Sequence, residues 1–211
     1  EIGNNHEGSY TLAEEMIGLA AESGADAVKF QTFQTEYYVS ADDDERYKRL
    51  KSFELSYNEF EKLSRVAKGA GILFISTPFD IESALFLDSI VDALKIASGD
   101  NNFYPLIETV AETGKPIIMS TGLADIQQII KSKTLIEKIW AQQDIVQDLA
   151  ILHCVSAYPV EPKYANLQAI QTLRESFDCT IGFSDHTLGT NAAIVSAVLG
   201  ARIIEKHFTI D

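Results

Sequence analysis

The sequence has 211 residues, 46% of them hydrophobic, and a formal net charge of −14 at pH 7. This length suits one domain with a sizeable core. The negative charge argues against nucleic acid or an anionic membrane surface as a partner, and no apolar run approaches the roughly 20 residues that span a bilayer. Two cysteines, Cys154 and Cys179, are too few for a disulfide framework, so we expect a cytoplasmic protein.

Short apolar, β-branched runs alternate with amphipathic segments of helical period, a pattern typical of βα units and a parallel sheet. The runs predict seven strands, and Glu1 and Ile2 would end a truncated first strand, which makes eight. Eight parallel strands favour a (β/α)8 barrel over an open sheet. The seven runs are residues 27–32, 72–77, 93–98, 116–120, 149–156, 180–184 and 201–208.

Helix start signals lie between these runs. Thr11 and Glu14 form a capping-box pattern at the start of a first helix. Residues 33–53 are expected to form a long polar loop. A barrel needs a helix after its last strand, and none follows here. We therefore expect residues 1–211 to be a single barrel domain that lacks the start of strand 1 and the last helix. The candidate N-caps of later helices are Asp80, Asp125, Asn166 and Thr190.

Polar side chains gather at the ends of the predicted strands, where barrel enzymes place their active sites. Lys29 and Lys95 lie mid-strand among apolar neighbours, and an unpaired buried ammonium is costly. One interpretation is a buried salt bridge, for example with Glu1 or Asp100. The other is anion binding, because lysines, short hydroxyls and backbone amides of tight turns suit a phosphate or carboxylate. The hydroxyls at neighbouring strand ends belong to Thr77, Ser98, Ser120 and Ser184.

His186 and His207 end the seventh and eighth strands. Adjacent strands lie about 4.8 Å apart, so two imidazoles there can reach one ion. Such a pair, with positions left open to water and substrate oxygens, suits manganese or a similar divalent ion. The alternative is that each histidine is a hydrogen-bonded structural residue. His153 and Cys154 lie in an apolar run and are expected to be buried core residues, and the acidic residues 42–45 a solvated loop.

Eight strings occur in order along the whole chain: EIGNNHEG, ADAVKFQTF, ISTPFD, LKIASGD, PIIMSTG, LHCVSAYP, GFSDHT and EKHF. Together they closely resemble the sialic acid synthase family. The resemblance implies condensation of phosphoenolpyruvate with an open-chain N-acetylmannosamine-like aldehyde to give a nonulosonic acid and phosphate. It also implies a (β/α)8 barrel followed by an antifreeze-like domain, absent from this chain, that is swapped across a homodimer.

The resemblance also implies roles for individual residues. His186 and His207 would bind the metal, Mn²⁺ or else Co²⁺ or Mg²⁺, and Glu1 would manage protons or water. Asp100 stands where the best-studied members have Glu, and Ser156 where some have Asn. The positions that match phosphoenolpyruvate contacts are Lys29, Lys95, Thr77, Ser98, Ser120 and Ser184. Those that match the side of the N-acylated amino sugar are Glu1, Gln31, Asp100 and Tyr158.

Two other functions remain open at this point. A Schiff-base aldolase would use Lys29 or Lys95 as the nucleophile on a keto-acid donor, after burial has favoured the neutral amine. Such an enzyme has no need of the histidine pair. A non-catalytic sugar-phosphate sensor would keep the anion pocket without turnover.

Overall fold

The computed structural model describes residues 1–210. These residues divide into two compact units, one formed by residues 1–94 with the segment from Phe208, the other by residues 95–207. In each unit strands and helices alternate, and the paired strands run parallel in chain order. The βα pattern predicted from the hydrophobic periodicity is therefore confirmed. No helix among residues 1–210 is long and apolar enough to cross a membrane.

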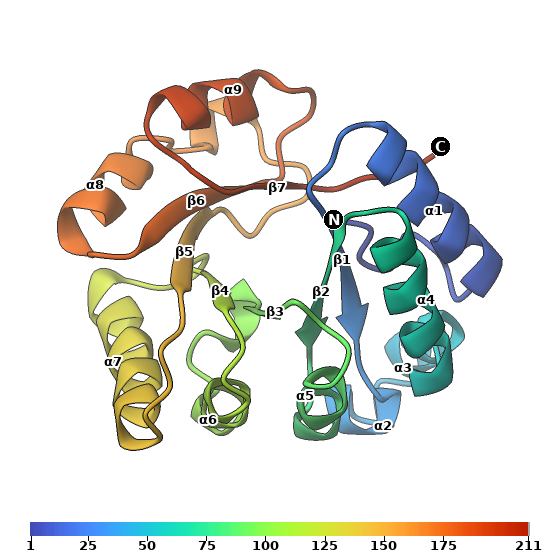
Figure 1. The fold of residues 1–211 in the computed structure, drawn as a ribbon. Helices are drawn as coiled ribbons and strands as arrows, with labels where there is room; N and C mark the ends of the chain where they lie inside the picture. Colours follow the sequence, from blue (N-terminus) through green and yellow to red (C-terminus); the bar gives the residue numbers. More distant parts are fainter. Residues whose placement is uncertain (211) are drawn as a thin grey trace. The chain divides into compact units, whose positions relative to one another are not determined.

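The first unit is built on three parallel strands with helices on their connections (Figure 1). Phe30 of β1 and Phe74 of β2 are almost fully buried, with ring centroids 5.4 Å apart, and pack with Phe60 of α4. Helices α1 and α4 pack against each other. The strands are β1 (Ala27–Thr32), β2 (Leu73–Pro78) and β3 (Ala93–Ile96), whose last two residues belong to the second unit. The helices are α1 (Tyr10–Glu22), α2 (Thr35–Tyr38), α3 (Asp44–Phe53), α4 (Tyr57–Gly69) and α5 (Ile81–Leu87).

The truncated first strand survives as a short bridged segment beside β1. Gly3 forms a single parallel bridge with Phe30. The backbone N–H groups of Ile2 and Gly3 donate to the Lys29 carbonyl at 2.9 and 3.1 Å. This pairing places Glu1 next to the inward-facing side chains of β1.

The second unit has four parallel strands in the order β4-β5-β6-β7, and α9 packs on β6 and β7 (Figure 1). The buried indole of Trp140 in α7 donates to the Ala111 carbonyl of α6 at 3.1 Å and so joins these two helices. The strands are β4 (Ile117–Ser120), β5 (Leu149–Cys154), β6 (Thr180–Asp185) and β7 (Ile204–Lys206). The helices are α6 (Tyr104–Glu112), α7 (Ile126–Gln142), α8 (Ala169–Ser176) and α9 (Asn191–Val198), with 3-10 turns at Ser98–Asp100 and Pro162–Tyr164.

The prediction of a long polar loop over residues 33–53 is wrong, because this segment contains α2 and α3. Asp43 caps α3 by accepting a hydrogen bond from the Arg46 N–H, and two acidic residues follow in the first turn. Both features stabilise a helix N-terminus. Leu50 is the one residue of α3 that is buried, so the hydrophobic periodicity that reveals most helices is missing here.

Two of the predicted N-caps are also displaced. Helix α1 is capped by Ser9, whose hydroxyl accepts from the Leu12 N–H, instead of by Thr11. Helix α8 begins after Gln168, and Asn166 adopts a positive φ of 46° in the preceding turn. Asp80 and Asp125 cap α5 and α7 as predicted.

Candidate functional site

Lys29 lies on β1 with its ammonium buried between an acid and a hydroxyl. It forms an ion pair with Glu1, and both side chains are less than a tenth exposed. Its Nζ also donates to Thr77 Oγ1 of β2 at 3.3 Å. Of the two interpretations of Lys29, the buried salt bridge to Glu1 is observed, and anion binding stays a prediction. Three predicted site residues are thus brought together, with a charged group held where water has little access.

Gln31 lies two residues after Lys29 on the same face of β1, because side chains alternate along a strand. Its Oε1 accepts a hydrogen bond from Asn4 Nδ2 at 2.8 Å. The Oδ1 atom of Asn4 is buried and has no hydrogen-bond partner in the described part of the chain. The segment after the truncated first strand therefore orients Gln31.

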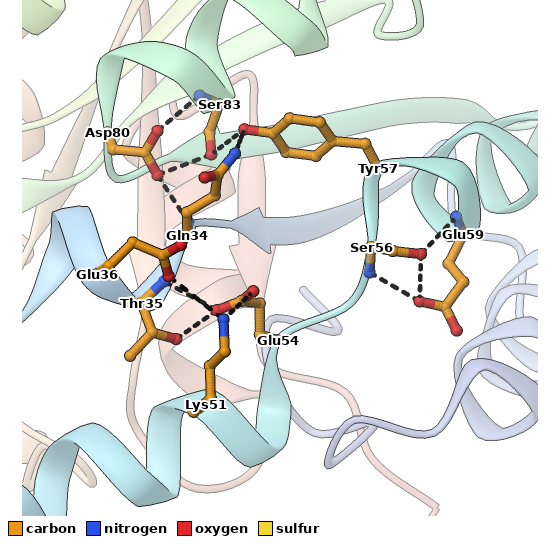
Figure 2. Close-up of polar contacts among 10 residues, drawn as sticks. All are labelled: Gln34, Thr35, Glu36, Lys51, Glu54, Ser56, Tyr57, Glu59, Asp80 and Ser83. Carbon is orange, nitrogen blue, oxygen red and sulfur yellow. Dashed lines mark hydrogen bonds and ion pairs between the residues drawn. The ribbon is translucent and has the colours of Figure 1, made fainter.

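A polar network fixes the chain just beyond β1 (Figure 2). One Asp80 oxygen accepts from the Gln34 N–H at 2.8 Å and from the Ser83 hydroxyl at 2.8 Å, and the other accepts from the Ser83 N–H. Gln34 Nε2 donates to the Tyr57 hydroxyl at 2.6 Å. One buried carboxylate therefore ties the exit of β1 to the start of α5.

A second carboxylate in Figure 2 anchors α2 to the end of α3. Glu54 Oε2 accepts from the Thr35 N–H at 2.9 Å and from the Thr35 hydroxyl at 2.5 Å. Lys51 Nζ donates to Glu54 Oε1 at 2.7 Å and to Glu36 at 3.3 Å. Charge-assisted hydrogen bonds thus hold the α2–α3 segment, in addition to the stacking of Tyr38 of α2 on Phe79.

Lys95 of β3 begins a chain of polar contacts through the second unit. Its Nζ donates to Ser120 Oγ at 2.7 Å and lies 3.5 Å from Glu205 Oε1. Ser184 Oγ donates to the same Glu205 oxygen at 2.7 Å, and lies 3.4 Å from His186 Nε2. Glu205 is therefore an acidic partner of Lys95 that the sequence analysis did not name. The chain of contacts leads from an ammonium to an imidazole.

His186 and His207 lie together, with ring centroids 5.5 Å apart. His186 Nδ1 is 2.8 Å from the Val155 carbonyl, an acceptor, so Nδ1 carries the proton and Nε2 keeps its lone pair. The Tyr158 ring lies 4.0 Å from that of His186 and 5.5 Å from that of His207. Two facing imidazoles, one with its tautomer fixed by a backbone carbonyl, fit a divalent metal. No group of three or more His, Cys, Asp or Glu side chains arranged to hold a metal occurs among residues 1–210.

Ser98 and Ser156 approach each other around Gly122. The Gly122 N–H donates to Ser98 Oγ at 3.1 Å. A Cβ atom at Gly122 would lie 2.7 Å from Ser98 Oγ and closer still to Ser156 Oγ. Only glycine leaves room for the two hydroxyls at this strand end.

Two titratable groups have strongly perturbed pKa values. Burial raises the pKa of Asp100, in the 3-10 turn after β3, to about 6. Burial lowers the pKa of His6 to about 4, although the nearby Glu59 carboxylate acts in the opposite direction. His6 is 1% exposed, and its Nε2 lacks a hydrogen-bond partner among the described residues. Asp100 is thus a carboxyl that titrates near neutral pH, as general acid–base chemistry requires.

Sequence reasoning assigned no role in this site to Asp185, Glu205, Lys206 or Cys154, although it predicted correctly that Cys154 is buried. Asp185 and Lys206, at the ends of β6 and β7, form an ion pair at 2.8 Å. Cys154 Sγ lies 4.0 Å from His186 Nδ1. Burial raises the pKa of the Cys154 thiol, but its hydrogen bonds with His186 and Ser98 more than offset this, so the net pKa is lowered. His153 is a buried core residue as predicted, with Nε2 2.8 Å from the Ala165 carbonyl.

The alternation of side chains along β6 and β7 offered a signal for these residues. Glu205 and His207 share one face of their strand, as Ser184 and His186 do on theirs. Asp185 and Lys206 fall on the opposite face, where acid and base meet at paired register positions. Opposite charges at paired positions of adjacent strands were therefore readable from the sequence once the register was known.

Comparison with known proteins extends over the whole chain. A family profile described as the NeuB family matches residues 16–211. A protein of Methanocaldococcus jannaschii is 46% identical over all of this chain, which covers 61% of that protein. The N,N'-diacetyllegionaminic acid synthase of Legionella pneumophila is 39% identical over all of this chain and 63% of its own length. The chain thus spans about three fifths of the length of these curated relatives.

A solved structure gives the same result. The N-acetylneuraminic acid (sialic acid) synthetase of Leptospira borgpetersenii, in complex with citrate, superposes with a TM-score of 0.93 at 37% identity. The match covers 100% of this chain and 72% of that one. The (β/α)8 class predicted from the sequence is confirmed, and the match to the family profile covers far more than half of the chain. The chain belongs to the NeuB family.

Proposed function

We propose that this chain is the catalytic barrel of a nonulosonic acid synthase, which condenses phosphoenolpyruvate with a 2-acetamido sugar aldehyde. The observation that carries the proposal is the continuous contact from Lys95 through Glu205 and Ser184 to His186. It joins an anion-binding ammonium to an imidazole suited to a metal, which are the two kinds of group that this reaction needs. The names of the relatives, a legionaminic acid synthase and a sialic acid synthetase, support the same reaction class.

In the proposed reaction, C3 of phosphoenolpyruvate forms a bond to the aldehyde carbon of the sugar, leaving an oxocarbenium-like centre at C2. Water adds to C2, and the C–O bond to phosphate then breaks, which leaves the keto acid and inorganic phosphate. A divalent metal at His186 and His207 would supply Lewis-acid polarisation of the aldehyde. Lys95 and Ser120 would bind and orient the anionic donor.

The remaining assignments also belong to the proposal. Glu1 is proposed to move a proton or position the water. Donor binding is also proposed for Lys29, Thr77, Ser98 and Ser184, and acceptor binding for Gln31, Asp100, Ser156 and Tyr158. The antifreeze-like domain, the homodimer, the cytoplasmic location and the choice of Mn²⁺ remain predictions.

The Schiff-base aldolase is disfavoured by the carboxylates beside both lysines. A Schiff base forms from the neutral amine, whereas Glu1 beside Lys29 and Glu205 beside Lys95 stabilise the charged ammonium. Borohydride trapping with a keto-acid donor separates the two mechanisms, because it labels the aldolase alone.

The direct test is phosphate release from phosphoenolpyruvate by the full gene product, with a panel of 2-acetamido sugars, each with Mn²⁺ and with chelator. Release that needs both sugar and metal is expected, and the best sugar identifies the product. Lys95→Met is expected to lower kcat/KM by about 10- to 100-fold, the effect of losing a hydrogen bond to a charged group. Lys131→Met, at an exposed position of α7, is the matched control. Binding without turnover in the folded, metal-loaded protein would instead favour the sensor.

A further inference from the structure

A cavity of about 330 Å³ lies in the second unit where β6 begins, lined by residues of α8, α9 and the turn between α9 and β7. It is at the opposite end of β6 from His186. From Thr180 to Asp185 the strand rises about 16 Å, at roughly 3.3 Å per residue. The cavity is therefore separate from the polar chain that starts at Lys95.

Two exposed arginines, Arg174 and Arg202, are among the residues that line this cavity. Arg174 Nη1 donates to the Leu199 carbonyl at the end of α9, at 3.3 Å. Within residues 1–210 neither guanidinium forms an ion pair with a carboxylate, whereas Arg65 of α4 pairs with Glu61 at 3.1 Å. The chain has 31 acidic and 17 basic residues, so two arginines left without an acid in one cavity indicate space for an external anion.

The backbone keeps this position open for a guanidinium. Gly200 has a φ of 101°, and a Cβ atom there would lie 2.5 Å from Arg174 Nη1. A side chain at this position would displace the Arg174 side chain, so the glycine permits the close approach. The guanidinium is thereby oriented by the backbone of the α9–β7 turn.

The rest of the lining is partly apolar. The largely buried residues Phe177 and Ile181 are among those that line the cavity. A volume near 330 Å³ is at the lower end for small-molecule sites, about 300–1,000 Å³, and exceeds the needs of a bare phosphate ion. An apolar wall beside two guanidiniums suits an anion that carries a small organic part.

We propose that this cavity binds a small phosphomonoester. Arg174 and Arg202 hold the phosphate oxygens, since the planar guanidinium matches phosphate with paired hydrogen bonds. Phe177 and Ile181 contact the organic part. The site goes beyond the proposed synthase reaction, because none of the residues assigned to that reaction lines it.

Cys179 supplies a local test, because its half-buried thiol lines the same cavity. The full gene product is alkylated with N-ethylmaleimide, and the Cys179 peptide is followed by mass spectrometry. The probes are glycerol 3-phosphate and inorganic phosphate, titrated at constant ionic strength. Saturable slowing of Cys179 alkylation is expected, with a lower half-saturation for glycerol 3-phosphate. Equal half-saturation concentrations for the two anions would mean that the cavity recognises only the phosphate group, and would contradict the contact proposed for Phe177 and Ile181.

Variants of Arg202 test whether its guanidinium is responsible for the slowing of Cys179 alkylation. Arg202→Gln replaces a guanidinium that has no hydrogen bond or ion pair to the described residues by a neutral amide, and is expected to raise the half-saturation about tenfold or more. Arg202→Lys keeps the charge and is expected to retain part of the protection, and Arg65→Gln is expected to behave as wild type. The proposal is overturned if neither anion slows the alkylation, or if Arg202→Gln is protected as well as wild type. Neither result bears on phosphate release from phosphoenolpyruvate.

Discussion

Lys206 fastens the ends of two neighbouring strands by donating to Asp185 Oδ2 at 2.8 Å and to the Thr187 carbonyl at 2.7 Å. The Asp185 side chain is fully buried, and its other oxygen accepts from the Thr187 N–H and hydroxyl. Each member of the ion pair is the immediate neighbour of one of the two histidines proposed to bind metal. We therefore expect the spacing of the imidazoles to depend on this ion pair.

Lys206→Met is expected to weaken Mn²⁺ binding by about tenfold or more, the usual effect of losing a residue that orients metal ligands. The affinity is measured by titration of Mn²⁺ with electron paramagnetic resonance, which needs no turnover. Lys48→Met removes an exposed ion pair with Asp44 and serves as control. An unchanged Mn²⁺ affinity in folded Lys206→Met would refute the dependence.

His6 is expected to make stability depend on pH. Its folded pKa of about 4 lies below the ordinary histidine value of 6.5, so the unfolded state binds more protons between these values, and stability falls as pH drops through this window. The loss between pH 7.5 and pH 5 is about 2 kcal/mol for this one group. Urea unfolding of wild type and His6→Asn at both pH values measures it. Asn keeps an acceptor for the Gly8 N–H, and equal pH slopes in the two proteins would contradict the prediction.

The Asp100 carboxylate is expected to lower the free energy of unfolding at neutral pH. Its folded pKa of about 6 exceeds the ordinary aspartate value of 3.8, so the folded state binds more protons between these values, and stability is lost as pH rises through 6. Asp100→Asn should raise the urea midpoint at pH 7.5, with little difference near pH 4, and should lower the rate of phosphate release. A variant that is both less stable and fully active would show that Asp100 is structural.

Glu54→Ala is expected to increase the local mobility of α2, because it removes the two hydrogen bonds that Thr35 donates to the Glu54 carboxylate. Hydrogen bonds to a charged acceptor contribute about 1.5–3 kcal/mol each, so amide exchange at Thr35 should accelerate about tenfold or more. Hydrogen exchange followed by mass spectrometry or NMR measures this rate. Glu36→Ala, which removes only the weaker contact to Lys51, is the matched control. Equal exchange at Thr35 in both variants would mean that the segment is held by other contacts.

The periodic parts of the fold were predictable from the sequence. The strand at residues 27–32 was located to the residue, because buried parallel strands combine apolar, β-branched character with short length. The strand predicted at residues 201–208 is observed only at Ile204–Lys206, because apolar composition does not show where strand pairing ends. Helix α3 was missed because its stability comes from caps and charge instead of an apolar stripe.

The sequence named residues of the candidate site but did not predict most of their pairings, and their roles stay predictions. The sequence indicated Lys29, Lys95 and the histidine pair, since charged side chains in apolar strands are rare without a role. It identified the Glu1 partner of Lys29 but not Glu205 as the partner of Lys95. Glu205 is distant in sequence, and only the register of β6 and β7 brings it beside Ser184.

The fluorescence of Trp140 can be used to follow the unfolding of one of the two units. Trp140 is the one tryptophan of the sequence, and it is buried between α6 and α7 in the second unit. Its fluorescence emission reports on residues 95–207 alone, whereas far-ultraviolet circular dichroism averages over every helix. Recording both signals along one denaturant titration therefore measures whether the two units melt together, without attaching any dye.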